Sequence, residues 1–199
     1  MDKRKLQLAI TLTDENEPSE RSFLEKVEKS SRHFMVLRKP VWEVTRVKTY
    51  LKAIPKRFYG NIILYRNWEL LHDFPCHGVH FPSDQMKEAT TARERFPDIW
   101  ISTSVHTAEE VERANQLPFT AILASPVFPP CSKPSTRPPL GLEGLREIAE
   151  RSLHPVIALG GITEENYRQC YDCQTVGTAA IGSIWSTANP AQFIIGEIS

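Results

Sequence analysis

The sequence lacks an excess of charge of either sign. Its 199 residues carry 24 lysines and arginines against 24 aspartates and glutamates, which gives a formal net charge of zero. A neutral chain exerts no general attraction on nucleic acid or on an anionic membrane surface. Neither partner is therefore expected, and any anionic ligand must be held by a local cluster of groups.

Long apolar runs are also missing. No apolar stretch of the sequence reaches the roughly 18 residues that a membrane-spanning helix needs. The N-terminus is basic and then apolar, as in a signal peptide, but the apolar run is short and is followed at once by Asp14 and Glu15. We interpret this run as a first β-strand, and a cytoplasmic protein is the simplest expectation.

Cysteine is sparse, and its spacing does not predict a zinc site. Of the four cysteines, only Cys170 and Cys173 are close in sequence, and no second pair or His-x-x-His motif completes a ligand set. The metal and redox interpretations of this pair are therefore weak. Without a signal peptide, reduced thiols in a cytoplasm are the simpler account.

What the chain does contain is a regular alternation of short apolar segments with amphipathic ones. Apolar strands separated by helices indicate a parallel sheet that is covered on its faces. Eight such units predict a single-domain (β/α)8 barrel, or TIM barrel, over residues 1–199. The expected strands are 6–11, 34–37, 61–64, 78–81, 99–104, 120–127, 155–159 and 176–182.

Local patterns place helices between these strands. Thr107 and Glu110 form a capping box, and Thr163, which precedes two glutamates, is a second candidate N-cap. Five apolar residues recur at spacings of three or four and predict one face of a further helix: Val41, Val44, Val47, Leu51 and Ile54.

The segment SPVFPPCSKPSTRPPLG, residues 125–141, contrasts with the short loops expected elsewhere. It contains six prolines, several hydroxyl groups and one lysine, Lys133. A long connection without secondary structure inside a compact domain is usually functional or disordered. This loop is therefore a candidate part of the site.

The active site of a (β/α)8 barrel lies at the C-terminal ends of its strands. Gly160 and Gly161 follow the seventh expected strand, and Gly182 and Ser183 follow the eighth. Glycine lets backbone amides approach a ligand closely, and helix N-termini supply unsatisfied N–H groups. These residues predict a phosphate-binding cup, with a tight turn as the purely structural alternative.

Cations follow other strands of the expected barrel. Arg38, Arg66 and Lys133 would all project from strand ends near this cup. Several cations that converge in one mouth indicate a polyanionic ligand. For Lys133 alone, a solvated loop lysine is an equally good interpretation.

Four runs occur in order and at family spacing: SVHTAEEV, SPVFPPCSKPSTRPPLGLEGLREIAE, PVIALGGITEENY and GTAAIGSIW. From Gly78 to Trp185 the chain resembles the thiamine-phosphate synthase/TenI family, and the first 77 residues resemble it weakly, with LRKP as the best match. The resemblance implies a TIM barrel of thiamine biosynthesis that binds a small-molecule thiazole phosphate. A homo-oligomer is compatible with it.

The resemblance also assigns site residues. Arg38 matches the family's pyrophosphate-facing arginine, and the proline-rich loop matches a flap over the ligands. Residues that meet pyrophosphate or thiazole ligands in the synthases match Ser104, Ser132 and Lys133. The thiazole-phosphate cup falls on Gly160, Gly161, Ile181 and Gly182, with Ser183 beside it.

The metal ligands of the synthases are not retained. Their Asn-Asp pair after the third strand falls on Tyr65 and Arg66, and their aspartate after the fourth strand falls on Gln85. Mg²⁺ favours carboxylate and phosphate oxygens, whereas an arginine repels it. Mg²⁺ is therefore expected only if the chain is a synthase, with Asp84 as a weak candidate ligand.

Three functional interpretations remain, and a TenI-like tautomerase is narrowly favoured. It would aromatise a thiazole carboxylate phosphate with His106 of the Ser-Val-His run as acid/base, because imidazole titrates near neutrality. The alternative is a divergent synthase that joins hydroxymethylpyrimidine pyrophosphate to thiazole phosphate, with Asp84, Arg66 and Lys133 around Mg²⁺ and pyrophosphate. The third is a non-catalytic thiazole-phosphate binder. Ser104 is a further candidate catalytic residue beside His106 and Lys133.

Two histidines also have purely structural interpretations. His106 could simply mark the entry to a helix without any catalytic duty. His80, in the run Gly-Val-His-Phe, is expected to be a strand residue with a packing role.

Overall fold

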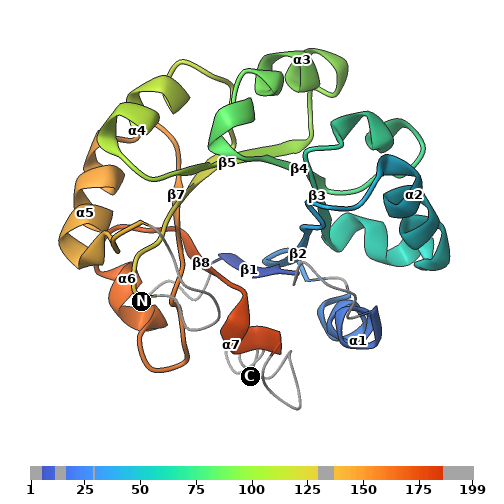
Figure 1. Ribbon diagram of the computed structural model, residues 1–199, viewed down its shortest axis with the longest axis horizontal. Helices are drawn as coiled ribbons and strands as arrows, with labels where there is room; N and C mark the ends of the chain where they lie inside the picture. Colours follow the sequence, from blue (N-terminus) through green and yellow to red (C-terminus); the bar gives the residue numbers. More distant parts are fainter. Residues whose placement is uncertain (1–5, 12–16, 29, 130–136, 186–199) are drawn as a thin grey trace.

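The strands form a closed parallel barrel in a computed structural model that describes residues 6–11, 17–28, 30–129 and 137–185. Each strand pairs with the next along the chain, and β8 pairs with β1 to close the ring (Figure 1). The predicted (β/α)8 barrel is confirmed. The eight strands are β1 (Leu6–Ile10), β2 (His33–Leu37), β3 (Ile62–Tyr65), β4 (Gly78–Phe81), β5 (Trp100–Val105), β6 (Ala121–Ala124), β7 (Val156–Leu159) and β8 (Gly177–Ala180).

The helices surround this barrel on the outside (Figure 1). The α-helices are α1 (Glu17–Val27), α2 (Val44–Ala53), α3 (Glu88–Arg95), α4 (Ala108–Ala114), α5 (Gly141–Arg151), α6 (Tyr167–Tyr171) and α7 (Gly182–Trp185). In the described part of the chain, three 3-10 helices add to the connections: η1 (Lys56–Asn61), η2 (Trp68–His72) and η3 (Ser83–Gln85).

Two separate apolar clusters follow from the alternation of side chains along each strand. One set, which includes Met35, Leu64 and Ile101, faces the helices. The other fills the barrel and consists of Leu8, Ile10, Phe34, Val36, Ile63, Ala121, Leu123, Ile157 and Ala179. The barrel is therefore a packed core, and a ligand can bind only at its end.

The apolar face predicted over residues 41–54 is only partly correct. Helix α2 begins at Val44 and buries Val47 and Leu51, but Val41 is 79% exposed and Val44 is 44% exposed. Trp42 packs against the core, with its ring 5.7 Å from that of Tyr50. At this end of the predicted face, Trp42 packs against the core, whereas Val41 and Val44 do not.

The two predicted helix caps have different outcomes. Thr107 caps α4 by accepting a hydrogen bond from Glu110 N at 3.3 Å, but the Glu110 carboxylate accepts from His106 N at 2.6 Å rather than from Thr107. The prediction of an N-cap at Thr163 is wrong, because a turn follows it and α6 begins only at Tyr167, with Asn166 as its N-cap. The Thr163 carbonyl accepts from Asn166 N and Tyr167 N within that turn.

A buried charge network holds α1 and α2 to the end of β2. Lys39 Nζ donates to Glu20 Oε1 at 2.7 Å, and Tyr50 OH donates to Glu20 Oε2 at 2.6 Å. The side chains of Lys39 and Glu20 are 1% and 0% exposed. Lys39 is therefore buried in this network, whereas its neighbour Arg38 in the LRKP run extends to the end of the barrel.

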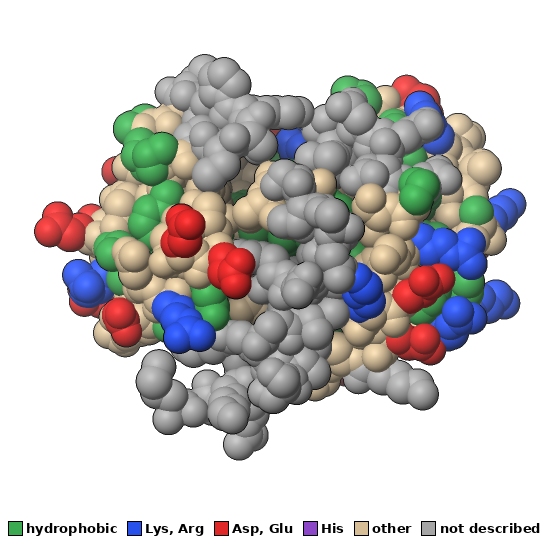
Figure 2. Space-filling view, turned by 90° about the horizontal axis from the view of Figure 1, so that it is seen from below, with side chains coloured by type: hydrophobic (Ala, Val, Ile, Leu, Met, Phe, Trp, Pro, Cys, Tyr) green, Lys and Arg blue, Asp and Glu red, His purple; other side chains and the backbone are tan. Residues whose placement is uncertain are grey.

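The surface shows no segregation of charge on the face seen from below, where acidic and basic side chains lie side by side on both flanks (Figure 2). Within the described part of the chain, every helix is too short or too polar to cross a bilayer.

Candidate functional site

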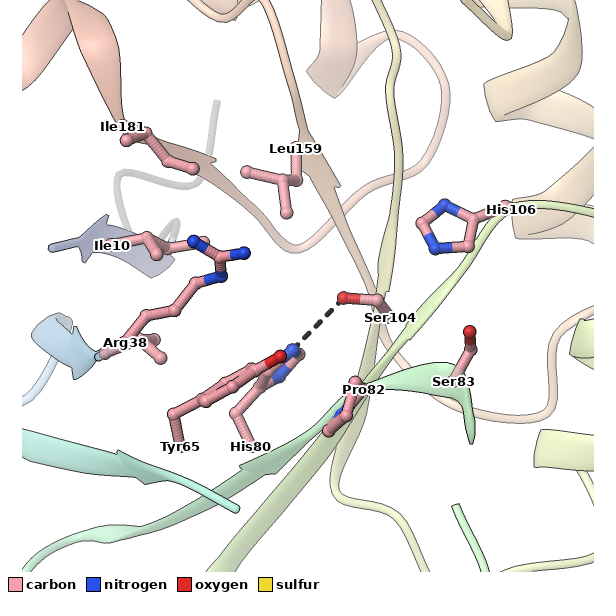
Figure 3. Close-up of a pocket in the computed structure, with 11 residues that line it drawn as sticks. Ile10, Arg38, Tyr65, His80, Pro82, Ser83, Ser104, His106, Leu159 and Ile181 are labelled. Atoms are coloured by element: carbon pink, nitrogen blue, oxygen red, sulfur yellow. Dashed lines mark hydrogen bonds between the residues drawn. The ribbon is translucent and has the colours of Figure 1, made fainter. Parts of the chain in front are cut away.

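A cavity of about 210 Å³ opens at the C-terminal ends of the strands, where the fold predicts an active site (Figure 3). Its lining mixes apolar and polar side chains, and the end of β2 supplies one of each, Val36 and Arg38. The lining residues are Ile10, Val36, Arg38, Tyr65, His80, Pro82, Ser83, Ser104, His106, Leu159 and Ile181. Three of the predicted site residues that are polar, Arg38, Ser104 and His106, therefore meet in one cavity.

Arg38 supplies a cation to the cavity wall. Its backbone is fixed to the end of β1, because Arg38 N donates to Thr11 Oγ1 at 2.9 Å and Thr11 Oγ1 donates back to Arg38 O at 3.2 Å. The guanidinium carbon lies 5.6 Å from the centre of the Tyr65 ring. Figure 3 shows the guanidinium extending into the space between Ile10 and Ser104, where it can contact an anion.

Arg66 lies beside the site rather than in its lining. Its guanidinium carbon is 5.1 Å from the centre of the Tyr65 ring, and its Nε is buried with no hydrogen-bond partner among the described residues. Its φ of 70° is in the left-handed region, which is uncommon for a non-glycine residue. Such strained positions are frequent near functional sites.

His80 lies inside the barrel between two serine hydroxyls of β5. Its Nδ1 is 3.0 Å from Ser102 Oγ, and its Nε2 is 3.1 Å from Ser104 Oγ (Figure 3). Burial, together with the nearby charge of Arg38, lowers the pKa of the imidazole from 6.5 to about 3. His80 is therefore neutral at physiological pH.

His106 is held in a defined orientation by the end of β6. Its Nδ1 is 2.6 Å from the carbonyl oxygen of Ser125, and its backbone N–H donates to Glu110 Oε2. A carbonyl can only accept a hydrogen bond, so Nδ1 must carry the proton of the neutral ring. Nε2 then keeps its lone pair and can accept a proton from a ligand.

The glycines after β7 have a structural role of their own. Gly160 and Gly161 have φ values of 95° and 64°, which favour glycine. A Cβ on Gly160 would lie 2.8 Å from Pro126 Cα, and a Cβ on Gly161 would lie 2.4 Å from the Pro129 carbonyl oxygen. The tight-turn interpretation therefore has direct support, and it is compatible with the predicted phosphate cup.

The other half of the predicted cup is at the start of α7. The carbonyl of Ile181 accepts from Ile184 N and Trp185 N, so helix geometry leaves the N–H groups of Gly182 and Ser183 without an intrahelical partner. The Ser183 hydroxyl donates to the Ile162 carbonyl at 2.6 Å and joins this turn to the one after β7. The phosphate cup itself stays a prediction.

Two of the predicted residues, Ser132 and Lys133, lie outside the described residues. The predicted flap therefore has no structural description over residues 130–136.

The magnesium prediction finds no matching ligand set in the described wall. Asp84 is exposed in η3, and its neighbour Ser83 lines the cavity instead. The polar groups of the described wall are a guanidinium, a phenol, two imidazoles and two hydroxyls. Mg²⁺ prefers carboxylate oxygens, so these residues do not fit the metal.

Three polar wall residues, Tyr65, His80 and Ser83, were not predicted as site residues. His80 is a buried strand residue, as predicted, but it also binds two serines at the cavity. The available signal was the spacing of Ser102 and Ser104, which point to the same face of β5 as neighbours of an inward His80. Tyr65 carries no such signal, because an aromatic residue at a strand end usually packs in a core.

The fold and the site together define a (β/α)8 barrel with a cationic, histidine-bearing cavity at the strand ends. The family model described as "Thiamine monophosphate synthase" matches residues 10–184. The chain belongs to this family.

Named relatives agree with that assignment. The thiamine-phosphate synthase of Albidiferax ferrireducens is 34% identical over 57% of this chain and 52% of the relative, and that of Bacillus licheniformis is 32% identical over 71% and 63%. The chain thus spans only about half to two thirds of their length. The relatives' names favour the synthase over the tautomerase interpretation.

Solved structures share the fold. The thiamine phosphate pyrophosphorylase from Pyrococcus furiosus has a TM-score of 0.76 and 21% identity, and the match covers 98% of both chains. A 3-hexulose-6-phosphate synthase matches with a TM-score of 0.67 and 16% identity over 98% of this chain and all of the other. At these identities the likeness supports the barrel and not a particular reaction.

Proposed function

We propose that the chain is a divergent thiamine-phosphate synthase that joins hydroxymethylpyrimidine pyrophosphate to thiazole phosphate. The names of the curated relatives support this reaction over the tautomerisation that residue matches alone favoured. In the reaction, the C–O bond to pyrophosphate breaks, the thiazole nitrogen forms a C–N bond to the same methylene carbon, and pyrophosphate leaves with the bonding electrons.

The observation that carries the proposal is the Arg38 guanidinium in the cavity wall. A departing pyrophosphate needs a positive partner, and Arg38 supplies one beside the Ser104 hydroxyl. The glycine turns after β7 and β8 are the proposed seat of the thiazole phosphate. The apolar residues Ile10, Leu159 and Ile181 line the cavity near these turns and can exclude water from the cation.

The proposal is tested by product formation. Pure protein is supplied with thiazole phosphate, hydroxymethylpyrimidine pyrophosphate and Mg²⁺, and thiamine phosphate is detected as fluorescent thiochrome. We expect product, with a loss of about 10²-fold or more in Arg38→Ala, the size seen when one charge-stabilising donor is removed. Arg95→Ala, at an exposed arginine away from the cavity, is the matched control. Absence of product from folded protein that binds thiazole phosphate contradicts the proposal.

A second candidate, the thiazole tautomerase, has one specific observation in its favour. The hydrogen bond from His106 Nδ1 to Ser125 O leaves Nε2 available as a base at the cavity, and a proton shift needs no metal ligand. If this is the reaction, His106→Ala lowers turnover of the thiazole carboxylate phosphate by about 10²–10⁴-fold. Full turnover by that variant excludes the candidate. Binding of thiazole phosphate without turnover in either assay identifies the non-catalytic binder.

A further inference from the structure

A polar chain of three side chains lies inside an otherwise apolar barrel. Ser102 is 0% exposed and His80 is 4% exposed, whereas Ser104 is half-buried and lines the cavity. The imidazole joins the two hydroxyls through its two nitrogens, at 3.0 Å and 3.1 Å. The chain thus runs from the barrel interior to the ligand space.

The direction of these hydrogen bonds follows from the charge of the ring. Burial lowers the pKa of His80 so far that the imidazole is neutral. A neutral imidazole has one N–H donor and one acceptor nitrogen. One serine must therefore donate to the ring, and the other must accept from it.

Only one of the two directions satisfies Ser102. Among the residues that the structure describes, the recorded hydrogen-bond partner of Ser102 Oγ is His80 Nδ1. If Nδ1 carried the proton, the fully buried Ser102 hydroxyl would have no acceptor for its own proton, which is costly in a core. If Nε2 carries it, Ser102 donates to Nδ1, and Nε2–H donates to Ser104 Oγ.

We infer that Ser102 and His80 form a relay that fixes the Ser104 hydroxyl as a hydrogen-bond donor to an oxyanion of the ligand. Because Ser104 Oγ already accepts from His80, its own O–H is left to point into the cavity. Figure 3 shows this hydroxyl between His80 and His106, facing the space that Arg38 enters. His80 lies in the cavity wall, and its proposed role is that of a positioning residue that acts through Ser104.

The ligand class follows from the groups on this side of the cavity. A fixed O–H donor beside a guanidinium suits a phosphate or pyrophosphate oxygen and disfavours a cationic ligand group. The assignment of this oxyanion to the departing pyrophosphate rests on the proposed function. The hydrogen-bond directions themselves do not depend on it.

The first experiment measures the protonation of His80 directly. Protein labelled with ¹⁵N-histidine is studied by two-bond ¹H–¹⁵N correlation NMR from pH 5.5 to 8, and the His80→Gln variant assigns the signals of the ring. We expect a neutral ring with the proton on Nε2 throughout this range. A proton on Nδ1, or a ring that becomes charged in this range, overturns the relay.

The second experiment separates positioning from packing. Binding of inorganic pyrophosphate is measured by calorimetry for wild type, Ser104→Ala, His80→Leu and His80→Gln, with unfolding curves to verify that each variant folds. We expect Ser104→Ala and His80→Leu each to weaken binding by about tenfold, the value of one charge-assisted hydrogen bond. His80→Gln, whose amide can donate to Ser104, should recover most of the affinity.

The double variant His80→Leu/Ser104→Ala completes the cycle. If His80 acts through Ser104, the double variant binds no more weakly than Ser104→Ala alone. Additive losses, or equal affinity of His80→Leu and wild type, overturn the proposal.

A parallel titration with inorganic phosphate distinguishes the two ligand sources. Stronger Ser104-dependent binding of pyrophosphate assigns the subsite to a diphosphate, and equal binding assigns it to a single phosphate. Binding of both anions without dependence on Ser104 contradicts the relay. Thiamine phosphate synthesis could fail while the His80 proton stays on Nε2 and anion binding still depends on Ser104. That result contradicts only the proposed function.

Discussion

At the scale of single residues, the charge state of His80 links the site to stability. Arg38, the Tyr65 ring and two serine hydroxyls face the imidazole, and none of these groups carries a negative charge that would balance a protonated ring. Folding therefore keeps the ring neutral where the unfolded chain would protonate it. This neutral form is also the one that can hold Ser104 in a single orientation.

A pH dependence of stability follows from the lowered pKa of His80. Between about pH 3 and 6.5 the unfolded chain binds a proton at His80 that the folded chain does not, so stability falls as the pH falls. The slope of the free energy of unfolding against pH that this group contributes is at most about 1.4 kcal/mol per pH unit.

Urea unfolding from pH 4.5 to 7 should show a shallower slope for His80→Gln than for wild type. Burial also lowers the pKa of His77, so part of the slope persists in the variant. Identical slopes in wild type and variant contradict this assignment.

At this scale, the sequence placed Arg38 at a strand end by its position, and it placed Ser104 and His106 there through their match to the family runs. The structure brings these three side chains into one cavity, and their roles stay predictions. His80 was assigned only to packing, because its hydrogen bonds depend on how β4 and β5 pair. That register is set by the whole barrel and is not visible in the run Gly-Val-His-Phe.

At the scale of elements, the turn after β7 is fitted closely to the start of the loop after β6. Phe128 N donates to the Gly160 carbonyl at 3.0 Å, and Val127 N donates to the Leu159 carbonyl at 2.9 Å. The glycines let the two backbones approach to this distance. The turn after β7, where the phosphate cup is predicted, is therefore joined by hydrogen bonds to the base of the loop.

The change Gly161→Ala should disturb both elements. It places a side chain at a φ of 64° and a Cβ 2.4 Å from the Pro129 carbonyl oxygen. Strain of this kind costs about 1–3 kcal/mol, and binding of thiazole phosphate should weaken with it. Gly60→Ala is the matched control, because a Cβ on Gly60 would meet nothing within 4 Å. Chemical unfolding and ligand titration of both variants measure the effect; equal stability of the two speaks against it.

The buried network of Glu20, Lys39 and Tyr50 should dominate the docking of α1. Glu20→Ala removes a buried carboxylate that accepts from both Lys39 and Tyr50, and the loss of one partner of a buried pair costs about 3–5 kcal/mol. The exposed helix pair Arg21–Glu25 supplies the control, since Arg21→Ala should cost about 0.5 kcal/mol or less. Urea unfolding distinguishes the two, and a Glu20→Ala effect as small as that of Arg21→Ala contradicts the prediction.

Strand positions were predictable because barrel strands are apolar on both faces, and all eight predicted strands overlap the observed ones. Helix starts were less predictable. Val41 and Val44 fit a helical period but are exposed, whereas Trp42 between them packs against the core. Thr163 fits a cap but belongs to a turn that precedes Asn166, the N-cap of α6. The local pattern does not contain these tertiary contacts and turn hydrogen bonds.

At the scale of the whole molecule, closure of the barrel makes β1 indispensable. It pairs with β2 on one side and with β8 on the other, and Leu8 and Ile10 belong to the core inside the barrel. The Trp185 indole of α7 also donates to the Ile10 carbonyl at 2.7 Å. The first and last parts of the described chain thus stabilise each other.

Deletion of residues 1–11 should therefore open the sheet. It would expose the unpaired edges of β2 and β8, and such edges promote association between chains. Size-exclusion chromatography and circular dichroism, with the full chain as reference, should show aggregation and loss of cooperative unfolding. A shortened chain with the elution volume and unfolding midpoint of the full chain contradicts this expectation.

The close fit between Gly160, Gly161 and the segment from Pro126 to Pro129 limits which sequence changes either segment can accept on its own. A new side chain at either glycine would collide with that segment, and a bulkier path of the segment would collide with the turn. The two stretches must therefore change together. A chimera that takes the proline-rich loop of a relative without its turn after β7 would lose the fit between the two segments. A chimera that takes residues 125–162 as a block would retain that fit.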